Sequence, residues 1–172
     1  MNKRRILVIS GLLFLTSICF VQAAKNGELT KAGLSLAAQD HVMVTPDQIK
    51  WGPGPPALPP GAQMALLDGD PSKAGALFTI RAKLPDGYKI PPHWHPTDEN
   101  VTVLQGTFMM GLGEKFDPAK AHSMKGGSFA RMPKETRHFE MAKGETMIQV
   151  HAIGPFEVTY VNASDDPRNK AK

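Results

Sequence analysis

Side chains that bind metal ions lie close together in the run from residue 87 to residue 106. His93 and His95 are two residues apart, Glu99 follows four residues later, and a glycine stands at each end of the run. In an extended strand residues i and i+2 emerge on the same face, so both imidazoles can reach one ion. A single later histidine, His138, could complete the set. The spacing predicts a metal-binding cluster within a β-hairpin frame.

Imidazole nitrogens and a carboxylate oxygen are together suited to Zn, Cu, Fe, Ni or Mn. The alternative is a pair of surface histidines in a proline-rich loop. Histidine is scarce, with 6 among 172 residues, and the flanking glycines stand where a hairpin frame needs them. These residue types meet at this spacing by chance at roughly 1 in 10^4 over the chain. We therefore favour the metal cluster.

The remaining pattern is typical of an all-β barrel or sandwich, because short apolar runs alternate with glycine, proline and aspartate. Residues 41–45 look like a first strand. Residues 52–61 hold too many prolines for a helix or a central strand, so we expect an extended segment that covers a sheet edge or joins strands. A proline-rich recognition peptide is the alternative. Residues 115–121 are predicted to contain a helical turn, and the absence of an internal repeat predicts one domain. The other predicted strands are Gln63–Leu67, Ala76–Leu84, Glu99–Leu104, Thr107–Leu112, Ser128–Met132, Thr146–Ile153 and Phe156–Val161.

Two of these runs place polar residues at alternating positions. Glu99 would share a face with Val101 and Val103, which places its carboxylate inward above two apolar side chains. In a later run Gln149 and His151 share a face. If that face looks inward, both residues could line a pocket as a substrate contact or proton donor. A neutral histidine satisfied by a backbone carbonyl is the alternative.

The N-terminus has the three parts of a secretory signal peptide: basic residues at 3–5, an apolar run over 6–21, and small residues at 21 and 23, the −3 and −1 positions of a cleavage site. We expect residues 1–23 to be removed after Ala23 and the protein to be periplasmic or secreted. A retained membrane anchor is the alternative, although the run is shorter than the about 20 apolar residues that a span needs. Lipid attachment at Cys19 is a third reading, but the small residue that usually precedes a lipid-linked cysteine is missing.

Composition excludes several classes of protein. The only cysteine lies in the expected signal peptide, so the mature chain can form no disulfide and offers no cysteine nucleophile. Removing the three basic residues of the signal leaves 17 lysines and arginines against 16 acidic residues. Apart from the basic tail at 168–172, no lysine or arginine run with interleaved aromatics remains, so nucleic-acid binding has little support. No G-x-S-x-G elbow or phosphate-binding loop is present. After signal removal we expect no membrane partner.

The spacing G-x5-H-x-H-x3-E-x6-G resembles the first motif of the cupin superfamily at every fixed position, and residues 127–138 resemble the second motif, G-x5-P-x-G-x2-H-x3-N. The resemblance implies a small antiparallel jelly-roll β-barrel in which His93, His95, Glu99 and His138 hold one metal ion. Its parts would be a signal peptide at 1–23, an arm with a first strand and proline-rich segment at 24–60, the cupin barrel at 61–161, and a tail at 162–172. The chain is similar to short secreted single-domain cupins whose reaction is uncharacterised.

Two positions depart from the second motif. Glu135 replaces a glycine, which implies a different turn or backbone strain, and Ala142 replaces an asparagine. The carboxylate of Glu135 lies three residues from His138, so it is expected either near the metal or solvated at the barrel mouth. Glu135, Gln149 and His151 are the candidate proton-transfer residues.

The resemblance and the ligand types together imply a mononuclear metalloenzyme with one divalent transition metal and a small-molecule substrate. Fe or Mn would suit an O2-dependent oxidation, which we favour, whereas Zn or Ni would suit isomerisation or hydrolysis. The alternative is a cupin that binds or senses a metal or small ligand without turnover. A structural zinc site is a third reading, against which the absence of thiolates weighs. The resemblance also implies a homodimer.

Overall fold

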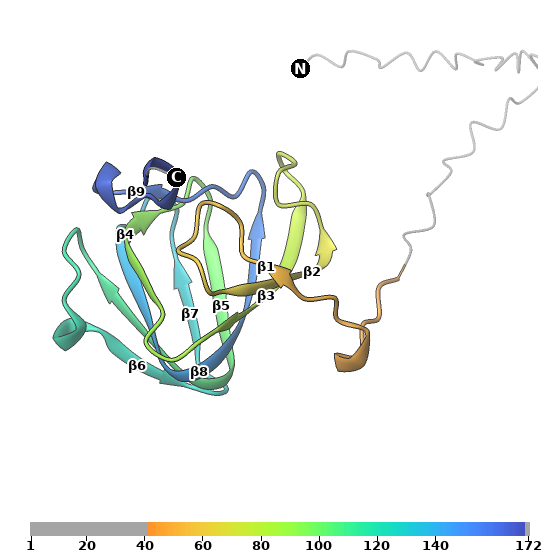
Figure 1. Ribbon diagram of the computed structural model, residues 1–172. Helices are drawn as coiled ribbons and strands as arrows, with labels where there is room; N and C mark the ends of the chain where they lie inside the picture. The colour runs from red at the N-terminus through yellow and green to blue at the C-terminus, as the bar shows by residue number, and fades with distance from the viewer. Residues whose placement is uncertain (1–40, 171–172) are drawn as a thin grey trace, which may run out of the picture. The chain divides into compact units, whose positions relative to one another are not determined.

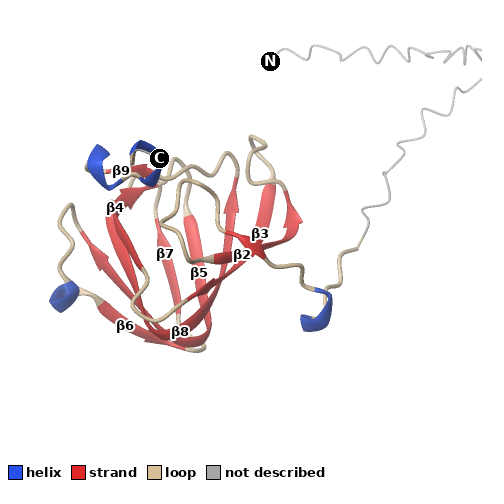
Figure 2. Cartoon of the chain, in the orientation of Figure 1, coloured by secondary structure: helices blue, strands red, loops and turns tan. Residues whose placement is uncertain are grey.

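The computed structural model describes residues 41–170 of the chain, and these form an all-β unit (Figures 1 and 2). Within them, nine strands join in one antiparallel sheet that curls strongly into a half-barrel. The strands are β1 (Gly52–Pro53), β2 (Gln63–Gly69), β3 (Leu77–Leu84), β4 (Lys89–Trp94), β5 (Glu99–Leu112), β6 (His122–Lys125), β7 (Phe129–Met132), β8 (His138–Ile153) and β9 (Thr159–Tyr160). Four 3-10 turns, η1 (Pro46–Gln48), η2 (Pro118–Lys120), η3 (Ala163–Asp165) and η4 (Pro167–Asn169), complete the unit.

Two long strands, β5 and β8, run through the whole sheet and hold it together. They pair from Glu99 opposite Ala152 to Leu112 opposite His138. On its other edge, β8 pairs first with β4 and then with β3, as can be followed in Figure 1. The β5–β8 register shifts around Gly106, whose φ of 78° is the left-handed conformation that glycine tolerates. The bend therefore joins two predicted strands, Glu99–Leu104 and Thr107–Leu112, into one.

The predicted alternation of buried and less buried residues is confirmed on the strand that carries Glu99. Glu99, Val101 and Val103 are all buried, while the residues between them are less so. On β3 the buried face carries Phe78, Ile80, Ala82 and Leu84. Burying each large apolar side chain contributes about 1.5–3 kcal/mol relative to leaving it exposed. The same alternation that builds the core thus brings the Glu99 carboxylate inside.

The structure corrects several element predictions. Residues 41–45 are exposed and form no strand, and the run at 156–161 contains only the two-residue β9. Strands β1, β4 and β6 were not predicted, and β8 begins eight residues before the predicted Thr146. The helical turn expected within 115–121 is confirmed as η2. The predicted signal peptide lies outside the described residues, as do residues 24–40 of the predicted arm.

Strand β4 escaped prediction because it contains Pro91 and Pro92. Proline cannot donate a hydrogen bond to a sheet neighbour, so it usually argues against a strand. Here the pairing of β4 with β8 is irregular between Ile90 and His93, and both prolines fall within that irregularity. The regular pairing resumes after them, and His93 lies opposite His138.

The sheet also contains one close glycine–aromatic contact. Gly111 on β5 lies opposite Phe139 on β8, whose side chain is fully buried. A Cβ atom at Gly111 would overlap the Phe139 ring. Phe116 packs against the same ring, with 5.0 Å between centroids. Glycine is therefore required at this position by packing.

Among residues 41–170, no helix is long and apolar enough to cross a membrane.

Candidate metal centre

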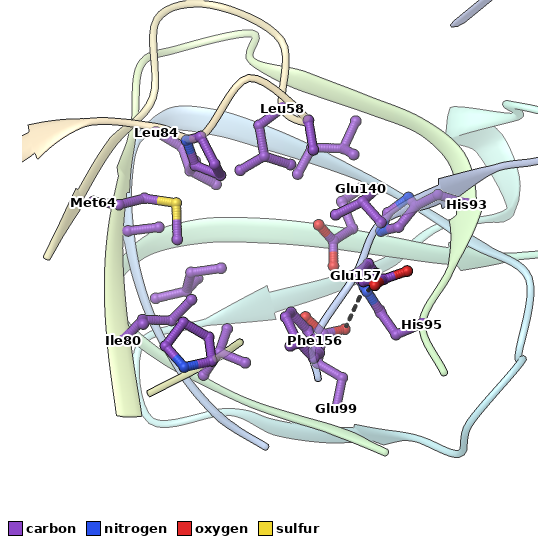
Figure 3. Close-up of a pocket in the computed structure, with 18 of the residues that line it drawn as sticks. Leu58, Met64, Ile80, Leu84, His93, His95, Glu99, Glu140, Phe156 and Glu157 are labelled. Carbon is purple, nitrogen blue, oxygen red and sulfur yellow. Dashed lines mark hydrogen bonds and ion pairs between the residues drawn. The ribbon is translucent and has the colours of Figure 1, made fainter. Parts of the chain in front are cut away.

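The curled sheet brings together four side chains from three strands and one loop. His93 lies on β4, His95 just beyond its end, Glu99 at the start of β5 and His138 at the start of β8. The imidazole centroids of His93 and His138 are 4.3 Å apart, and those of His93 and His95 are 5.0 Å apart. Figure 3 shows His93, His95 and Glu99 directed toward one another beside a cavity. The four residues of the sequence motifs therefore converge.

Close distances join the imidazoles to the carboxylate. Oε2 of Glu99 lies 3.4 Å from Nε2 of His138 and 3.9 Å from Nε2 of His95. One ligand atom from each of His93, His95 and His138 lies within 4.8 Å of the other two. All four side chains are buried, with residue exposures of 0–5%. Three imidazoles and a carboxylate that are this close together and this deeply buried could hold a divalent transition metal.

Each imidazole is oriented by a backbone carbonyl. Nδ1 of His93 donates to the Pro91 carbonyl at 2.8 Å and Nδ1 of His138 donates to the Thr136 carbonyl at 2.8 Å. Nδ1 of His95 donates to the Glu157 carbonyl at 2.7 Å. A carbonyl can only accept, so the proton must be on Nδ1 in each case. Nε2 of every ring is left for the shared centre, which is the arrangement that metal-binding histidines require.

Several atoms facing the centre have no hydrogen-bond partner among the described residues. They are Nε2 of His95, Nε2 of His138, Oε2 of Glu99 and Oε1 of Glu140. A buried polar atom without a partner costs about 1–3 kcal/mol, so native proteins seldom leave four together. Three of these atoms belong to the predicted ligands. A cation would satisfy nitrogen and oxygen lone pairs at once, and the donor set therefore fits a metal.

The ionisation of the cluster shows what charge it favours. Burial alone would lower the pKa of His138, but the carboxylates of Glu99 and Glu140 raise it to about 9. Burial opposes ionisation of Glu99 too, yet His138 and His95 lower its pKa to about 2. Burial lowers the pKa of His93 and of His95. The carboxylates of Glu99 and Glu140 thus favour positive charge at the shared centre.

Glu140 is a residue that sequence reasoning missed. It lies on β8 two residues after His138, so both side chains point to the same side, and it is 3% exposed. Its Oε1 lies 3.8 Å from Nε2 of His138. Burial, and then repulsion by Glu99, raise the pKa of Glu140 to about 8. A histidine and a glutamate two apart in one apolar run were the available signal, the same i, i+2 spacing as His93 and His95.

A cavity of ≈ 310 Å³ opens beside the cluster. Its polar end is formed by His93, His95, Glu99 and Glu140. In Figure 3 the wall opposite these residues is made by Met64, Ile80 and Leu84. Further apolar wall is provided by Leu58, Ala82, Ile90, Ile148, Val150, Phe156 and Val158. The centre thus lies at one end of a largely apolar chamber.

The three predicted proton-transfer residues do not line this cavity. Gln149 and His151 alternate with the buried cavity residues Ile148 and Val150, so they point to the other face of the sheet. There His151 Nδ1 shares a hydrogen bond with the Thr79 hydroxyl at 2.9 Å, and His151 Nε2 lies 2.8 Å from Gln149 Nε2. The hypothesis that this face looks inward is wrong.

Glu135 also lies away from the cavity, because its side chain is exposed and takes no part in the cluster. Its φ of 61° is the left-handed conformation in which a glycine would be unstrained. The backbone amide of Glu135 donates to the His95 carbonyl at 2.8 Å. The strained turn therefore supports the loop carrying His95, and it does so through the backbone.

Known structures share this fold. The polyketide cyclase RemF from Streptomyces resistomycificus superposes with a TM-score of 0.58 at 19% identity, covering 75% of this chain and 91% of that one. A proposed acetylacetone dioxygenase from Methylibium petroleiphilum PM1 gives 0.57 at 21% identity, covering 74% and 85%. KdgF from a Halomonas species gives 0.51 at 19% identity, covering 67% and 96%.

No curated protein matches the sequence. The family described as the ChrR cupin-like domain matches residues 39–157, which is more than half of the chain. That range includes the four converging residues and most of the curled sheet. This chain therefore belongs to the ChrR cupin-like family of the cupin superfamily.

Proposed function

We propose that this protein is a mononuclear metalloenzyme acting on a small organic molecule, with O2-dependent oxidation as the favoured reaction. The observation that carries the proposal is the set of unpartnered Nε2 and Oε atoms that converge beside a cavity. A ligand set of three imidazoles and one carboxylate leaves positions open on an ion that prefers six ligands. When bound, such an ion supplies a Lewis acid and, for Fe or Mn, redox chemistry.

In this proposal, His93, His95, His138 and Glu99 hold the ion. The carbonyls that accept from the imidazole Nδ1 atoms keep each Nε2 aimed at the centre, and the Glu99 charge offsets part of the charge of the cation. The apolar wall excludes water from the reacting end of the substrate, which strengthens every polar interaction made there. Glu140 is the protein group best placed to exchange a proton with a bound molecule, and it replaces the three residues predicted from sequence.

The similar structures support a small organic substrate. RemF is named a polyketide cyclase and the Methylibium protein is named for an oxygenase reaction; at this identity they share the fold with this chain. Mixed imidazole and carboxylate ligation suits Fe(II) or Mn(II) and hence oxidation. Zn or Ni in the same ligand set would favour isomerisation or hydrolysis.

We also propose that the protein is exported and acts as a jelly-roll barrel in the periplasm or outside the cell. The basic and apolar segments before Ala23 support this. The mass of the mature protein, purified from its own compartment, tests it. Cleavage after Ala23 gives a chain beginning at Ala24, and an intact N-terminus would contradict export through this signal. Homodimer formation is a further proposal, checked by the mass of the native protein in solution.

Elemental analysis of the purified protein is the experiment that tests the main proposal. We expect near-stoichiometric Fe or Mn in the wild type, loss of the metal in His93→Ala and His138→Ala, and no loss in His151→Ala. The last variant is the matched control, since His151 is an imidazole of the same sheet that points away from the centre. Oxygen consumption with candidate substrates would follow. Wild-type protein without metal, as stable as its variants, would refute the proposal.

The deep burial of all four ligands favours one alternative function. Exposures of 0–5% also suit a cupin that sequesters a metal or senses a small ligand without turnover. The same preparation separates the two functions. Stoichiometric metal that does not exchange with added competitor, together with no change in any substrate tested, would support the binding protein over the enzyme.

A further inference from the structure

The wall of the cavity offers a ligand very few hydrogen bonds. Beyond the polar end, the inward faces of β3 and β8 present only aliphatic groups, from Ile80, Ala82 and Leu84 on β3 and from Ile148 and Val150 on β8. The proline-rich segment contributes Pro55, Ala57 and Leu58 as a roof. A polar group of a ligand placed against these surfaces would lose its water and gain nothing, at a cost of about 1–3 kcal/mol.

The polar side chains closest to the roof are already engaged. The Tyr88 hydroxyl donates to the Pro59 carbonyl and the Tyr160 hydroxyl donates to the Ala57 carbonyl at 2.8 Å. These two bonds hold the roof on the half-barrel. At the mouth, the exposed Arg168 guanidinium donates to Asp166 and to the Val158 carbonyl. None of these groups is free to recognise a ligand deep in the cavity.

Two carboxyl groups remain, that of the exposed Glu157 and that of the buried Glu140. Of these two, only Glu140 offers a buried atom, Oε1, to a ligand. This atom lines the cavity, its residue is 3% exposed, and it has no hydrogen-bond partner among residues 41–170. Figure 3 shows the Glu140 carboxyl at the same end as His93, across the cavity from Met64 and Ile80. A ligand group reaching the metal end therefore meets this carboxyl, while the rest of the ligand meets aliphatic wall.

We infer that the cavity takes a small, predominantly apolar organic molecule carrying one hydroxyl or carbonyl group, and that Glu140 recognises that group. The inference rests on the proposed function, because the metal completes the polar end. A volume of ≈ 310 Å³ lies at the lower end of the range of small-molecule pockets, about 300–1,000 Å³. Sugars and other polyols are disfavoured because their remaining hydroxyl groups would face the apolar wall without partners.

The test is calorimetric titration of the full metal-loaded protein with para-alkylphenols of increasing chain length, from para-cresol to para-propylphenol and longer. We expect affinity to rise about fourfold for each added methylene until the chamber is full, and then to fall. The methyl ether of the best phenol should bind at least about tenfold more weakly, because it can no longer donate a hydrogen bond to Glu140. Glucose should not bind.

Three variants locate the binding site. Ala82→Leu adds three carbons at the aliphatic wall and should abolish binding of the longest phenol while retaining para-cresol. Glu140→Leu should lose the discrimination between the phenol and its methyl ether, and Glu140→Gln, which keeps a polar partner, should retain it. All three variants should keep the metal content of the wild type, which shows that the fold and the centre are intact.

The outcomes separate this inference from the proposed function. Full metal content with an affinity that is flat along the series, or with stronger binding of glucose, would overturn the inference and leave the metalloenzyme standing. An intact affinity series in protein that contains no metal would overturn the metalloenzyme proposal and leave the inference about the ligand standing. Loss of metal from Glu140→Leu would overturn the assignment of Glu140 to the ligand and make it a metal ligand instead.

Discussion

Removing the metal should lower the melting temperature of this protein by about 10 °C. The physical reason is the set of four buried atoms without partners, on His95, Glu99, His138 and Glu140, which a cation would satisfy. A ligand that binds only the folded state at a hundred times its dissociation constant stabilises that state by about 2.7 kcal/mol. For a domain of roughly this size, each kcal/mol shifts the melting temperature by about 3–5 °C. The product is a shift of about 8–14 °C.

The assay is thermal unfolding followed by circular dichroism, with chelator and then with Fe, Mn, Zn or Ni restored. His93→Ala should melt at one temperature under both conditions, since the ligand set is broken. His151→Ala should show the full wild-type shift, because its ring lies on the other face of the sheet. The pair separates loss of a metal ligand from loss of any buried or half-buried imidazole.

Two results would refute this reasoning. A wild-type melting temperature that no metal raises would show that the unpartnered atoms do not form a cation site. A shift that survives in His93→Ala would place the metal elsewhere in the chain. Elemental analysis of the same samples distinguishes failure to bind from failure to stabilise.

Three further predictions concern single residues. In the metal-free protein, burial and then the charge of Glu99 raise the pKa of Glu140 to about 8, above the ordinary value of a glutamate. Between these two values the folded state keeps a proton that the unfolded state has lost, so stability falls as pH rises, by roughly 1 kcal/mol per pH unit. Urea unfolding at several pH values should show this slope in the wild type and a smaller slope in Glu140→Gln. The slope that remains in the variant, between about pH 6.5 and 9, is due to His138, whose raised pKa stabilises the fold only at lower pH. Equal slopes in the two proteins would contradict the assignment to Glu140. Gly111→Ala should cost about 1–3 kcal/mol by pushing its new methyl group into the Phe139 ring, measured as a lower urea midpoint with unchanged metal content. Glu135→Gly should raise stability by up to about 1 kcal/mol, because glycine relieves the left-handed strain at φ 61°; a lower melting temperature would show that the Glu135 side chain has a stabilising contact.

Much of the fold could be predicted from the sequence because the alternation of buried and exposed residues along a strand is a local property. The alternation of Phe78, Ile80 and Leu84 on β3 could be read directly from the residue order, as could that of Glu99, Val101 and Val103 on β5. Strand β4 could not, because Pro91 and Pro92 are tolerated only through an irregular pairing with β8 that no local pattern reveals. The union of two predicted strands into β5 likewise depended on the bend at Gly106.

For the candidate site, local spacing indicated three of the four ligands. His93 and His95 share a face because any extended chain puts i and i+2 together, and the short loop to Glu99 keeps the carboxylate near them. The approach of His138, 39 positions after Glu99 in the chain, was implied by resemblance to the cupin motifs. Its physical cause is the pairing of β4 with β8, which sets His93 opposite His138.

What only the tertiary structure decided is which way each face points. Period two groups Gln149 with His151 and separates them from Ile148 and Val150, but it does not say which group lies inside, since a sheet has two faces and both can hold polar residues. The curl of β8 turned the aliphatic pair toward the cavity and brought Glu140 to the metal end. The types of the metal-binding residues could thus be predicted from the sequence. The position of the Glu140 carboxyl and the apolar chamber depended on how the sheet folds around the metal centre.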